Sequence, residues 1–385
     1  MINIENFNPE LLRVRPIAFA RFKDLSMRQV ALAILFLTLL SAGCEKNPVD
    51  NDDDPPPPPE IVDHYKLYAL TSGFFTSTGL ALIDIPSDTV LRVVDSIPDI
   101  FTTLSITPDM QSVLISGIGV DSTVVYDADS LTRVIVLPFG GSYHFDHQRN
   151  LGLLVTPSLF YEINPSNFTL GDSINRANGY SQIDTANGVL YTTGPFGVPA
   201  TFIYRYDYLT MTFIDSLAIV DGTGGAITVT NLLPVSSANR IYFYGIRGNA
   251  SAAYIYNTLT KAIVLATPHD FPIGNFMKST DGQTAYKADP GGLTTPGSGK
   301  LWKYSIPGDA ISGSIPTTYQ EGATTITINL TSLVMTPDGK YIYGAGGLPG
   351  RVVQIPLAQN KITHAFDPYI SYFPPVIVLG KKIEP

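Results

Sequence analysis

The chain is poor in the residues from which most metal and redox sites are built. Its 385 residues include one cysteine, Cys44, together with five histidines and one tryptophan. A single cysteine excludes an intrachain disulfide. Five histidines supply little for a site that gathers ligands from several parts of the chain. We therefore predict no metal and no cofactor.

Charged residues are also scarce, at 15% of the chain, and acidic residues outnumber basic ones to give a net charge of -9. From Cys44 onward, 19 basic and 30 acidic residues leave a net charge near -11. Such a surface repels phosphate backbones, so we expect no nucleic acid among the partners.

The N-terminal part contains an apolar run, Val30 to Leu40, that is short for a membrane span. A spanning helix needs about 20 apolar residues. The run follows Met27-Arg28-Gln29 and precedes Ser41-Ala42-Gly43-Cys44, which is the order of a secretory signal. The alternative is a membrane-anchoring helix that ends at a cysteine by chance.

With a cysteine directly after the small residues, this segment resembles a bacterial lipoprotein signal with its lipobox, although Ser41 stands where leucine is commonest. The resemblance implies that the chain is cut before Cys44, that Cys44 is lipidated, and that the protein is anchored to a membrane. We expect a place in the bacterial cell envelope, on the periplasmic or the surface face of the outer membrane.

Three regions follow from this reading. Residues 1–43 form a signal region that is removed, and Met27 is the expected true start. Residues 44–61 form a tether, because the stretch EKNPVDNDDDPPPPPE combines mutually repelling aspartates with prolines that favour polyproline II. Residues 62–385 form one folded domain.

Glycine, proline and aromatic residues are plentiful in the whole chain. There are 33 Gly, 30 Pro, 21 Tyr and 19 Phe. A turn-rich composition with many aromatic residues and few charges favours an all-β protein over a helical one.

The stretch Ser332 to Phe366 shows the pattern most clearly. A short apolar strand is followed by the turn Thr336-Pro337-Asp338-Gly339, and then come strands over Tyr341–Tyr343, Val352–Leu357 and Ile362–Phe366. Antiparallel strands joined by such turns form a meander.

Weaker copies of this unit recur along the chain. Three features align them: a third strand that ends in Ile-Pro, a fourth strand that carries Asp-Ser-Ile/Leu, and a Pro-Asp or Asp-Gly turn before the second strand. The second strands are predicted at Tyr65–Leu70, Ser112–Ser116, Leu151–Val155, Val189–Thr192, Ile241–Tyr244, Thr284–Lys287 and Tyr341–Tyr343.

Seven four-stranded units with a period near 40–50 residues are typical of a β-propeller. The chain enters the first unit on its second strand, while Phe373-Pro374-Pro375-Val376-Ile377-Val378-Leu379 reads as a lone first strand. We therefore predict an all-β, seven-bladed propeller of antiparallel blades, closed by the C-terminal strand joining the N-terminal blade.

The stretch Thr336 to Tyr343, with the two strands after it, resembles a YVTN-type repeat. Residues 64–380 as a whole resemble the seven-bladed YVTN (YncE-like) propellers, although units three to five lack the Pro-Asp-Gly turn. The resemblance implies a secreted or surface binding protein, related in fold to quinoprotein dehydrogenases and to lactonases.

His144-Phe145-Asp146-His147 is the strongest polar cluster in the sequence. On a strand, His144 and Asp146 point to one side and His147 to the other. We name His144 and Asp146 as candidate ligand-binding residues. The alternative is a polar strand end that enters a turn.

Aromatic residues give a second candidate surface. Trp302, together with Phe202, Tyr204, Tyr206 and Tyr208 on one face of a strand, could form a sugar- or peptide-binding platform. Aromatic residues at every second position are also typical of packing between blades. Trp302 is the third candidate ligand-binding residue.

The Asp-Ser-Ile/Leu triplets and Asp121-Ser122-Thr123 resemble bacterial O-glycosylation acceptors. Those on predicted fourth strands are Asp95-Ser96-Ile97, Asp172-Ser173-Ile174 and Asp215-Ser216-Leu217. Their regular position on strands also agrees with a purely structural role.

The sequence contains no catalytic signature, since it lacks a G-x-S-x-G elbow and a P-loop. We therefore expect a lipid-anchored propeller that acts as a non-enzymatic binding or scaffold module for a protein, a glycan or a small ligand. The alternatives are a hydrolase or oxidoreductase of the lactonase or quinoprotein type, and a structural surface-layer component.

Overall fold

The computed structural model describes residues 63–72, 78–97, 101–117, 120–176, 179–195, 201–248, 250–269, 276–289, 298–347, 350–367 and 376–383. These residues are almost entirely strands and turns. None of them lies in a helix long and apolar enough to cross a membrane. The segments predicted to be a signal region and a tether, including Cys44, lie outside the described residues.

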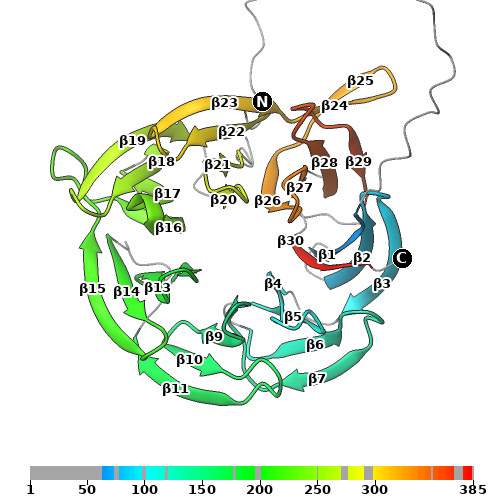
Figure 1. Ribbon diagram of the computed structural model, residues 1–385, viewed down its shortest axis with the longest axis horizontal. Coiled ribbons are helices and arrows are strands. Elements are labelled where there is room, and N and C mark those ends of the chain that lie inside the picture. The colour runs from blue at the N-terminus through cyan, green and yellow to red at the C-terminus, as the bar shows by residue number, and fades with distance from the viewer. Residues whose placement is uncertain are drawn as a thin grey trace, which may run out of the picture. The chain divides into compact units, whose positions relative to one another are not determined.

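Seven four-stranded antiparallel sheets surround a common centre (Figure 1). Each sheet is one blade. Blade 1 contains β1 (Tyr65–Ser72), β2 (Thr78–Ile85), β3 (Thr89–Ile97) and β30 (Val376–Lys382); blade 2 contains β4 (Thr103–Ile106), β5 (Ser112–Ser116), β6 (Thr123–Asp127) and β7 (Arg133–Leu137); blade 3 contains β8 (Ser142–Asp146), β9 (Leu151–Val155), β10 (Leu159–Ile163) and β11 (Leu170–Asn175).

The other four blades follow in chain order. Blade 4 contains β12 (Ser181–Asp184), β13 (Val189–Thr193), β14 (Phe202–Asp207) and β15 (Thr212–Ala218); blade 5 contains β16 (Thr228–Val235), β17 (Arg240–Arg247), β18 (Ala250–Asn257) and β19 (Ala262–His269); blade 6 contains β20 (Phe276–Lys278), β21 (Thr284–Lys287), β22 (Lys300–Ser305) and β23 (Ala310–Pro316); blade 7 contains β26 (Leu330–Met335), β27 (Tyr341–Gly346), β28 (Arg351–Pro356) and β29 (His364–Phe366).

The predicted fold class is confirmed, and each of the seven expected second strands lies at its predicted place. Two features were not predicted. The hairpin β24 (Thr318–Glu321) and β25 (Thr324–Thr327) lies in the connection between blades 6 and 7 and projects from the ring (Figure 1). A short 3-10 helix, η1 (Ser236–Ala238), follows β16.

The ring closes as the sequence predicted, because the last strand completes the first blade. β30 pairs antiparallel with β1, with Ile377 opposite Ala69 and Val378 opposite Tyr68. The hydrogen-bonding edge that β1 would otherwise expose on the channel side is thereby covered. Residues from the two ends of the domain are thus held in one sheet.

Tight turns repeat at one edge of every blade. Each turn between the third and fourth strands has one non-glycine residue with φ between 47° and 59°, three to five residues after the end of the third strand. These residues are Asp88, Leu131, Phe168, Met211, Lys261, Asp309 and Asn360. A left-handed residue in the corresponding turn of all seven blades shows that the turn is a structural repeat.

The core is divided among the interfaces between neighbouring blades. One cluster holds Phe160 of β10 against Tyr206 of β14, with ring centroids 4.8 Å apart. Second strands such as β5, β9 and β17 are the most buried, because they lie between two other strands of their own blade and pack against neighbouring blades. The outermost strands are largely exposed. Val134 and Val136 on β7, for example, are 60% and 47% exposed.

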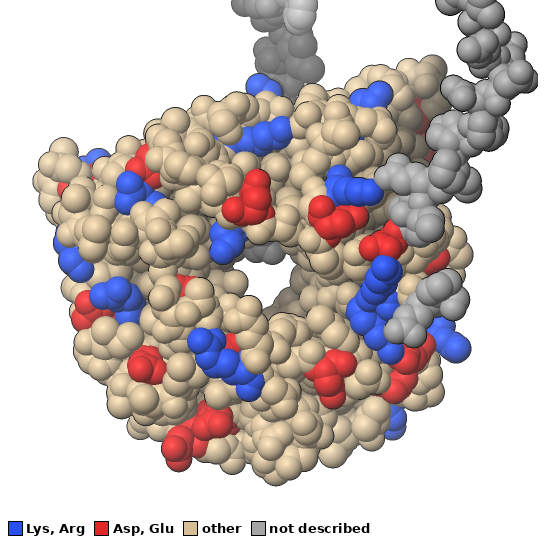
Figure 2. Space-filling view, viewed as in Figure 1, with Lys and Arg blue, Asp and Glu red and all other residues tan. Residues whose placement is uncertain are grey.

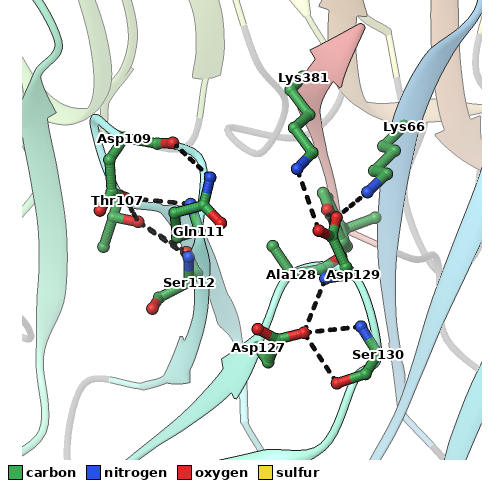
Figure 3. Close-up of polar contacts among 11 residues, drawn as sticks. Lys66, Thr107, Asp109, Gln111, Ser112, Asp127, Ala128, Asp129, Ser130 and Lys381 are labelled. Atoms are coloured by element: carbon green, nitrogen blue, oxygen red, sulfur yellow. Dashed lines mark hydrogen bonds and ion pairs between the residues drawn. The ribbon is translucent and has the colours of Figure 1, made fainter. Parts of the chain in front are cut away.

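An ion-pair clasp fixes the closing blade to blade 2. Asp129, in the turn after β6, accepts from the ammonium groups of Lys66 on β1 and Lys381 on β30 (Figure 3). Tyr68 of β1 also donates a 2.7 Å hydrogen bond to the carbonyl oxygen of Ala128. One carboxylate therefore links both strands that meet at the closure to the next blade.

We predict that Asp129→Asn lowers the free energy of unfolding by about 1–2 kcal/mol, because Lys66 is nearly buried and would lose its anionic partner. Urea denaturation would measure this, with the exposed Asp121→Asn as the matched control. Equal midpoints for the wild type and Asp129→Asn would show that the clasp contributes no stability.

Candidate functional site

A central opening runs through the ring on the face shown in Figure 2. The innermost strands of the seven blades, which surround this opening, are β30, β4, β8, β12, β16, β20 and β26. These strands carry mostly small hydroxyl-bearing and apolar residues. On the face shown, acidic and basic side chains are interspersed around the opening, so they do not create a field of one sign (Figure 2).

Hydroxyl groups of the innermost strands connect neighbouring blades. Thr103 and Ser105 of β4 donate to the carbonyl oxygens of Gly141 and Tyr143, at distances of 3.4 Å and 3.0 Å. At the closure, the amide of Ile377 donates to Ser332 Oγ at 3.2 Å. The inner wall is therefore partly held together by side chains that would otherwise be available to a ligand.

His144 lies on the innermost strand of blade 3 and makes a contact of this kind. Its Nε2 lies 2.7 Å from Ser181 Oγ on β12, the innermost strand of blade 4. The protein encloses the imidazole on most sides, and this desolvation lowers the pKa of His144 to about 4. His144 is therefore neutral near pH 7.

A serine hydroxyl beside a neutral imidazole is also the geometry of a nucleophile and its general base. A base with a pKa near 4, however, has little driving force to take a proton from a serine hydroxyl near pH 7. The contact between His144 and Ser181 is therefore better suited to joining two blades than to activating a nucleophile.

Asp146 ends the same strand and is buried, with 1% of its surface exposed. Its Oδ1 accepts from the backbone amides of Gln148 and Arg149, and its Oδ2 accepts from Arg149 Nη1 at 2.6 Å and Tyr208 Oη at 2.7 Å. Burial favours the neutral acid, but these hydrogen bonds outweigh it and hold the pKa of Asp146 below its usual value. The carboxylate thus fixes its own turn and anchors Tyr208 of blade 4.

His144 and Asp146 both face blade 4, which agrees with their predicted common side. The structure does not bring Trp302 to them. Trp302 lies on β22, the third strand of blade 6, where it packs beside the cluster between blades 5 and 6. Its ring centroid lies 5.2 Å from Lys300 Nζ. The three candidate residues therefore do not form a single site.

The aromatic residues of β14, with Tyr208 directly after it, divide into two groups. Tyr206 and Tyr208 are buried against blade 3, as the packing interpretation predicted. Phe202 is 41% exposed and stacks on Tyr204, with ring centroids 6.2 Å apart. The guanidinium of Arg176 lies 3.8 Å from the Tyr204 centroid. Only the beginning of this strand, at Phe202 and Tyr204, presents an aromatic surface.

The remaining histidines lie apart from one another. His64 Nδ1 lies 2.8 Å from Asp84, and His364 of blade 7 pairs with Asp88 of blade 1. His147 is exposed in the turn after β8, and the side chain of His269 is not among those described. In the described part of the chain, no three or more His, Cys, Asp or Glu side chains gather where they could hold a metal ion.

Sequence reasoning missed the polar residues that connect blades through the turns between third and fourth strands. Arg240 of blade 5 pairs with Asp309 of blade 6, and Lys303 of blade 6 donates to Asn360 of blade 7. Asp309 and Asn360 occupy the repeated left-handed position. Their shared spacing from the end of the third strand is a signal that an alignment of all seven units could have found.

The lowered pKa of His144 predicts a pH-dependent stability. Between pH 6.5 and about 4 the unfolded chain binds a proton that the folded chain does not, so stability falls as the pH falls through this range. Between pH 7 and pH 5, the wild type should lose up to about 2 kcal/mol relative to His144→Gln in urea denaturation.

The exposed His147→Gln serves as the control for this comparison and should keep the wild-type pH dependence. Parallel pH profiles for the wild type and His144→Gln would contradict the assignment of an enclosed, neutral imidazole to this position.

Comparison with known proteins supports the architecture. No family model matches the chain, and no curated protein matches its sequence. Among solved structures, the ring is similar to a hypothetical selenium-binding protein from Sulfolobus tokodaii, with a TM-score of 0.62 and 11% identity over 83% of this chain and 94% of that one.

Two further structures show the same likeness. A functionally unknown protein from Desulfotomaculum acetoxidans has a TM-score of 0.58 and 11% identity, over 81% of this chain and 98% of that one. The dihydro-heme d1 dehydrogenase NirN has a TM-score of 0.54 and 11% identity, over 84% of this chain and 77% of that one. At such identities the comparison shows the fold alone: the chain is a seven-bladed β-propeller.

Proposed function

We propose that the chain is a lipid-anchored propeller of the bacterial cell envelope that acts as a non-enzymatic binding or scaffold module. The observation that carries this proposal is the use of His144 and Asp146. These are the two residues best suited to catalysis, and their side chains contact Ser181 and Tyr208 of the neighbouring blade. A ring whose polar groups hold neighbouring blades together is rigid, and a rigid ring is suited to presenting a binding surface to a partner.

The binding surface would lie at the edge of the ring opposite the tight turns. Antiparallel strands place the second-to-third connections and the links between blades at that edge. There the chain runs from β21 ending at Lys287 to β22 starting at Lys300, and it adds the hairpin β24–β25. Long connections on a rigid scaffold are where binding residues usually lie. The ligand class is a protein, a glycan or a small molecule.

We propose that the chain is a YVTN-type (YncE-like) propeller, because of the turns that the sequence repeats. The Thr336 hydroxyl lies 2.5 Å from Asp338 Oδ1, and this carboxylate accepts from the amide of Lys340. Thr107 with Asp109, and Ser279 with Asp281, form the same turn in blades 2 and 6. The repeated turn supports a common repeat unit.

The anchor rests on Cys44 and the segment before it. Lipidation of Cys44 would tie the tether to the outer membrane and hold the ring near that surface. We expect that Cys44→Ser abolishes incorporation of radiolabelled palmitate in vivo and moves the protein from the membrane fraction to the soluble one. Ser41→Leu, which brings the signal closer to the usual lipobox, should keep both properties. Labelling that persists in Cys44→Ser would contradict the assignment.

The catalytic alternative is tested by native mass spectrometry with elemental analysis of the full-length lipoprotein, followed by assays with lactones and 4-nitrophenyl esters. We expect no stoichiometric metal and the same background turnover in the wild type and His144→Ala. A metal or an esterase activity that disappears in His144→Ala, while the protein remains folded, would replace the binding proposal with a hydrolase.

A further inference from the structure

Two Asp-Ser-aliphatic triplets lie in matching places on consecutive blades. Asp172-Ser173-Ile174 lies on β11, the outermost strand of blade 3, and Asp215-Ser216-Leu217 lies on β15, the outermost strand of blade 4. Both strands are hydrogen-bonded to a neighbour on one side only within the described sheets. The triplets are thus extended segments on the rim of the ring.

The fold explains part of each triplet. Leu217 is 1% exposed in the cluster that joins blades 4 and 5, and Ile174 packs against the cluster between blades 3 and 4. Asp215 forms a bidentate pair with Arg205 at 2.6 Å. The aliphatic position therefore has a structural role in both blades, and the acidic position has one in blade 4.

The serines have no such role. Ser173 and Ser216 are exposed on their strands, and the hydroxyl groups of both face solvent without a hydrogen bond to the described protein. Packing therefore does not account for a serine at the centre of both triplets. An exposed hydroxyl on an extended rim strand is accessible to a modifying enzyme, which a serine in the channel or between blades is not.

We propose that Ser173 and Ser216 are acceptor sites for O-linked glycans, an inference that rests on the proposed export of the chain to the envelope. The donor would be a sugar linked to a polyprenyl diphosphate. Ser Oγ would attack the anomeric carbon and form the glycosidic bond, while the bond from that carbon to the diphosphate breaks and its electrons leave with the diphosphate. The hydroxyl proton would pass to a base of the transferase.

Glycans at these positions would also serve the fold. The free edges of β11 and β15 can pair with a strand of another chain, and a bulky polar group on the rim blocks this approach. The tight-turn edge, the loop edge and the channel would all remain uncovered. The modification is therefore compatible with the proposed binding function.

The chain contains an internal control with nearly the same sequence. Asp129-Ser130-Leu131 is also an Asp-Ser-Leu triplet, but it lies in the turn after β6 (Figure 3). The Ser130 hydroxyl donates to Asp127 Oδ1 at 2.8 Å, and Asp129 is held by two lysines. We expect Ser130 to stay unmodified, since its triplet is neither extended nor free.

The other two triplets are poorer candidates on structural grounds. In Asp121-Ser122-Thr123, Ser122 is half-buried and Thr123 is buried in the interface between blades 2 and 3. Asp95-Ser96-Ile97 ends β3, and the side chain of Ser96 is not among those described.

The test is mass spectrometry of the full-length chain expressed in a bacterium with a general O-glycosylation system. The host also expresses a secreted reporter that carries an Asp-Ser-Leu triplet and is known to be glycosylated. We expect intact masses above the lipoprotein mass by one or two glycans, with glycopeptides that contain Ser173 and Ser216. Ser173→Ala with Ser216→Ala should remove the added mass, and Ser130→Ala should not.

Asp172→Asn separates recognition from structure, because Asp172 is exposed on the rim. We expect it to abolish the modification at Ser173, to leave that at Ser216, and to keep the wild-type melting temperature. Unmodified Ser173 and Ser216 beside a glycosylated reporter would overturn the proposal. If the protein is also unlipidated and retained in the cytoplasm, then the proposed export has failed as well, and the two failures are told apart by the lipid on Cys44.

Discussion

The pairing of β30 with β1 is the contact on which the remaining structure depends. In an open arrangement, the innermost position of blade 1 would be empty and the interface between blades 7 and 1 would lose one partner. β30 fills that position and contributes Ile377 to the cluster shared by blades 7 and 1. Because every blade is packed only against its two neighbours, a ring opened at one interface loses support at both of its ends.

Ring closure also explains why polar side chains lie at the interfaces between blades. The clasp of Lys66, Lys381 and Asp129 joins blades 1 and 2, and His364 with Asp88 joins blades 7 and 1. Similar contacts between side chains occur at other interfaces. Charged residues are only 15% of the chain, and several of them fix one blade against the next.

This use of polar residues bears on function. Catalysis at the channel would require acids and bases from several blades to converge on one point with their reactive atoms accessible. The two candidate groups on β8, His144 and Asp146, instead contact the neighbouring blade. What varies along the ring is the length of the connections at the loop edge and the chemistry of the rim. Under the proposed binding function, both would be surfaces for recognition.

Much of the fold could be predicted from the sequence because the repeat is encoded locally. Turn residues such as those at Thr336-Pro337-Asp338-Gly339 mark strand ends, and β-rich apolar segments mark second strands. The lone C-terminal strand indicated closure for the same reason. The hairpin β24–β25 was missed because its threonine-rich strands lack the apolar pattern of a blade.

The candidate site could be predicted only in part. Side chains alternate between the two faces of a strand, so His144 and Asp146 could be predicted to share one side. Their partners, however, depend on which residues of blade 4 lie opposite them. Ser181 and Tyr208 are 37 and 62 residues away in sequence. Trp302 was grouped with the aromatic residues Phe202 to Tyr208 on chemical type alone. Chemical type does not say which blade, or which strand of a blade, a residue occupies.

Hydrogen–deuterium exchange on the two strands of the closure tests the central claim most directly. If closure holds the ring together, then the amides of β1 and β30 exchange only through global unfolding. They should have the same protection as the amides of central strands such as β17, and Asp129→Asn should weaken all of them together. If β30 exchanges rapidly while β17 stays protected, then the ring persists without the pairing of β30 with β1. Closure would then not be the contact on which this fold depends.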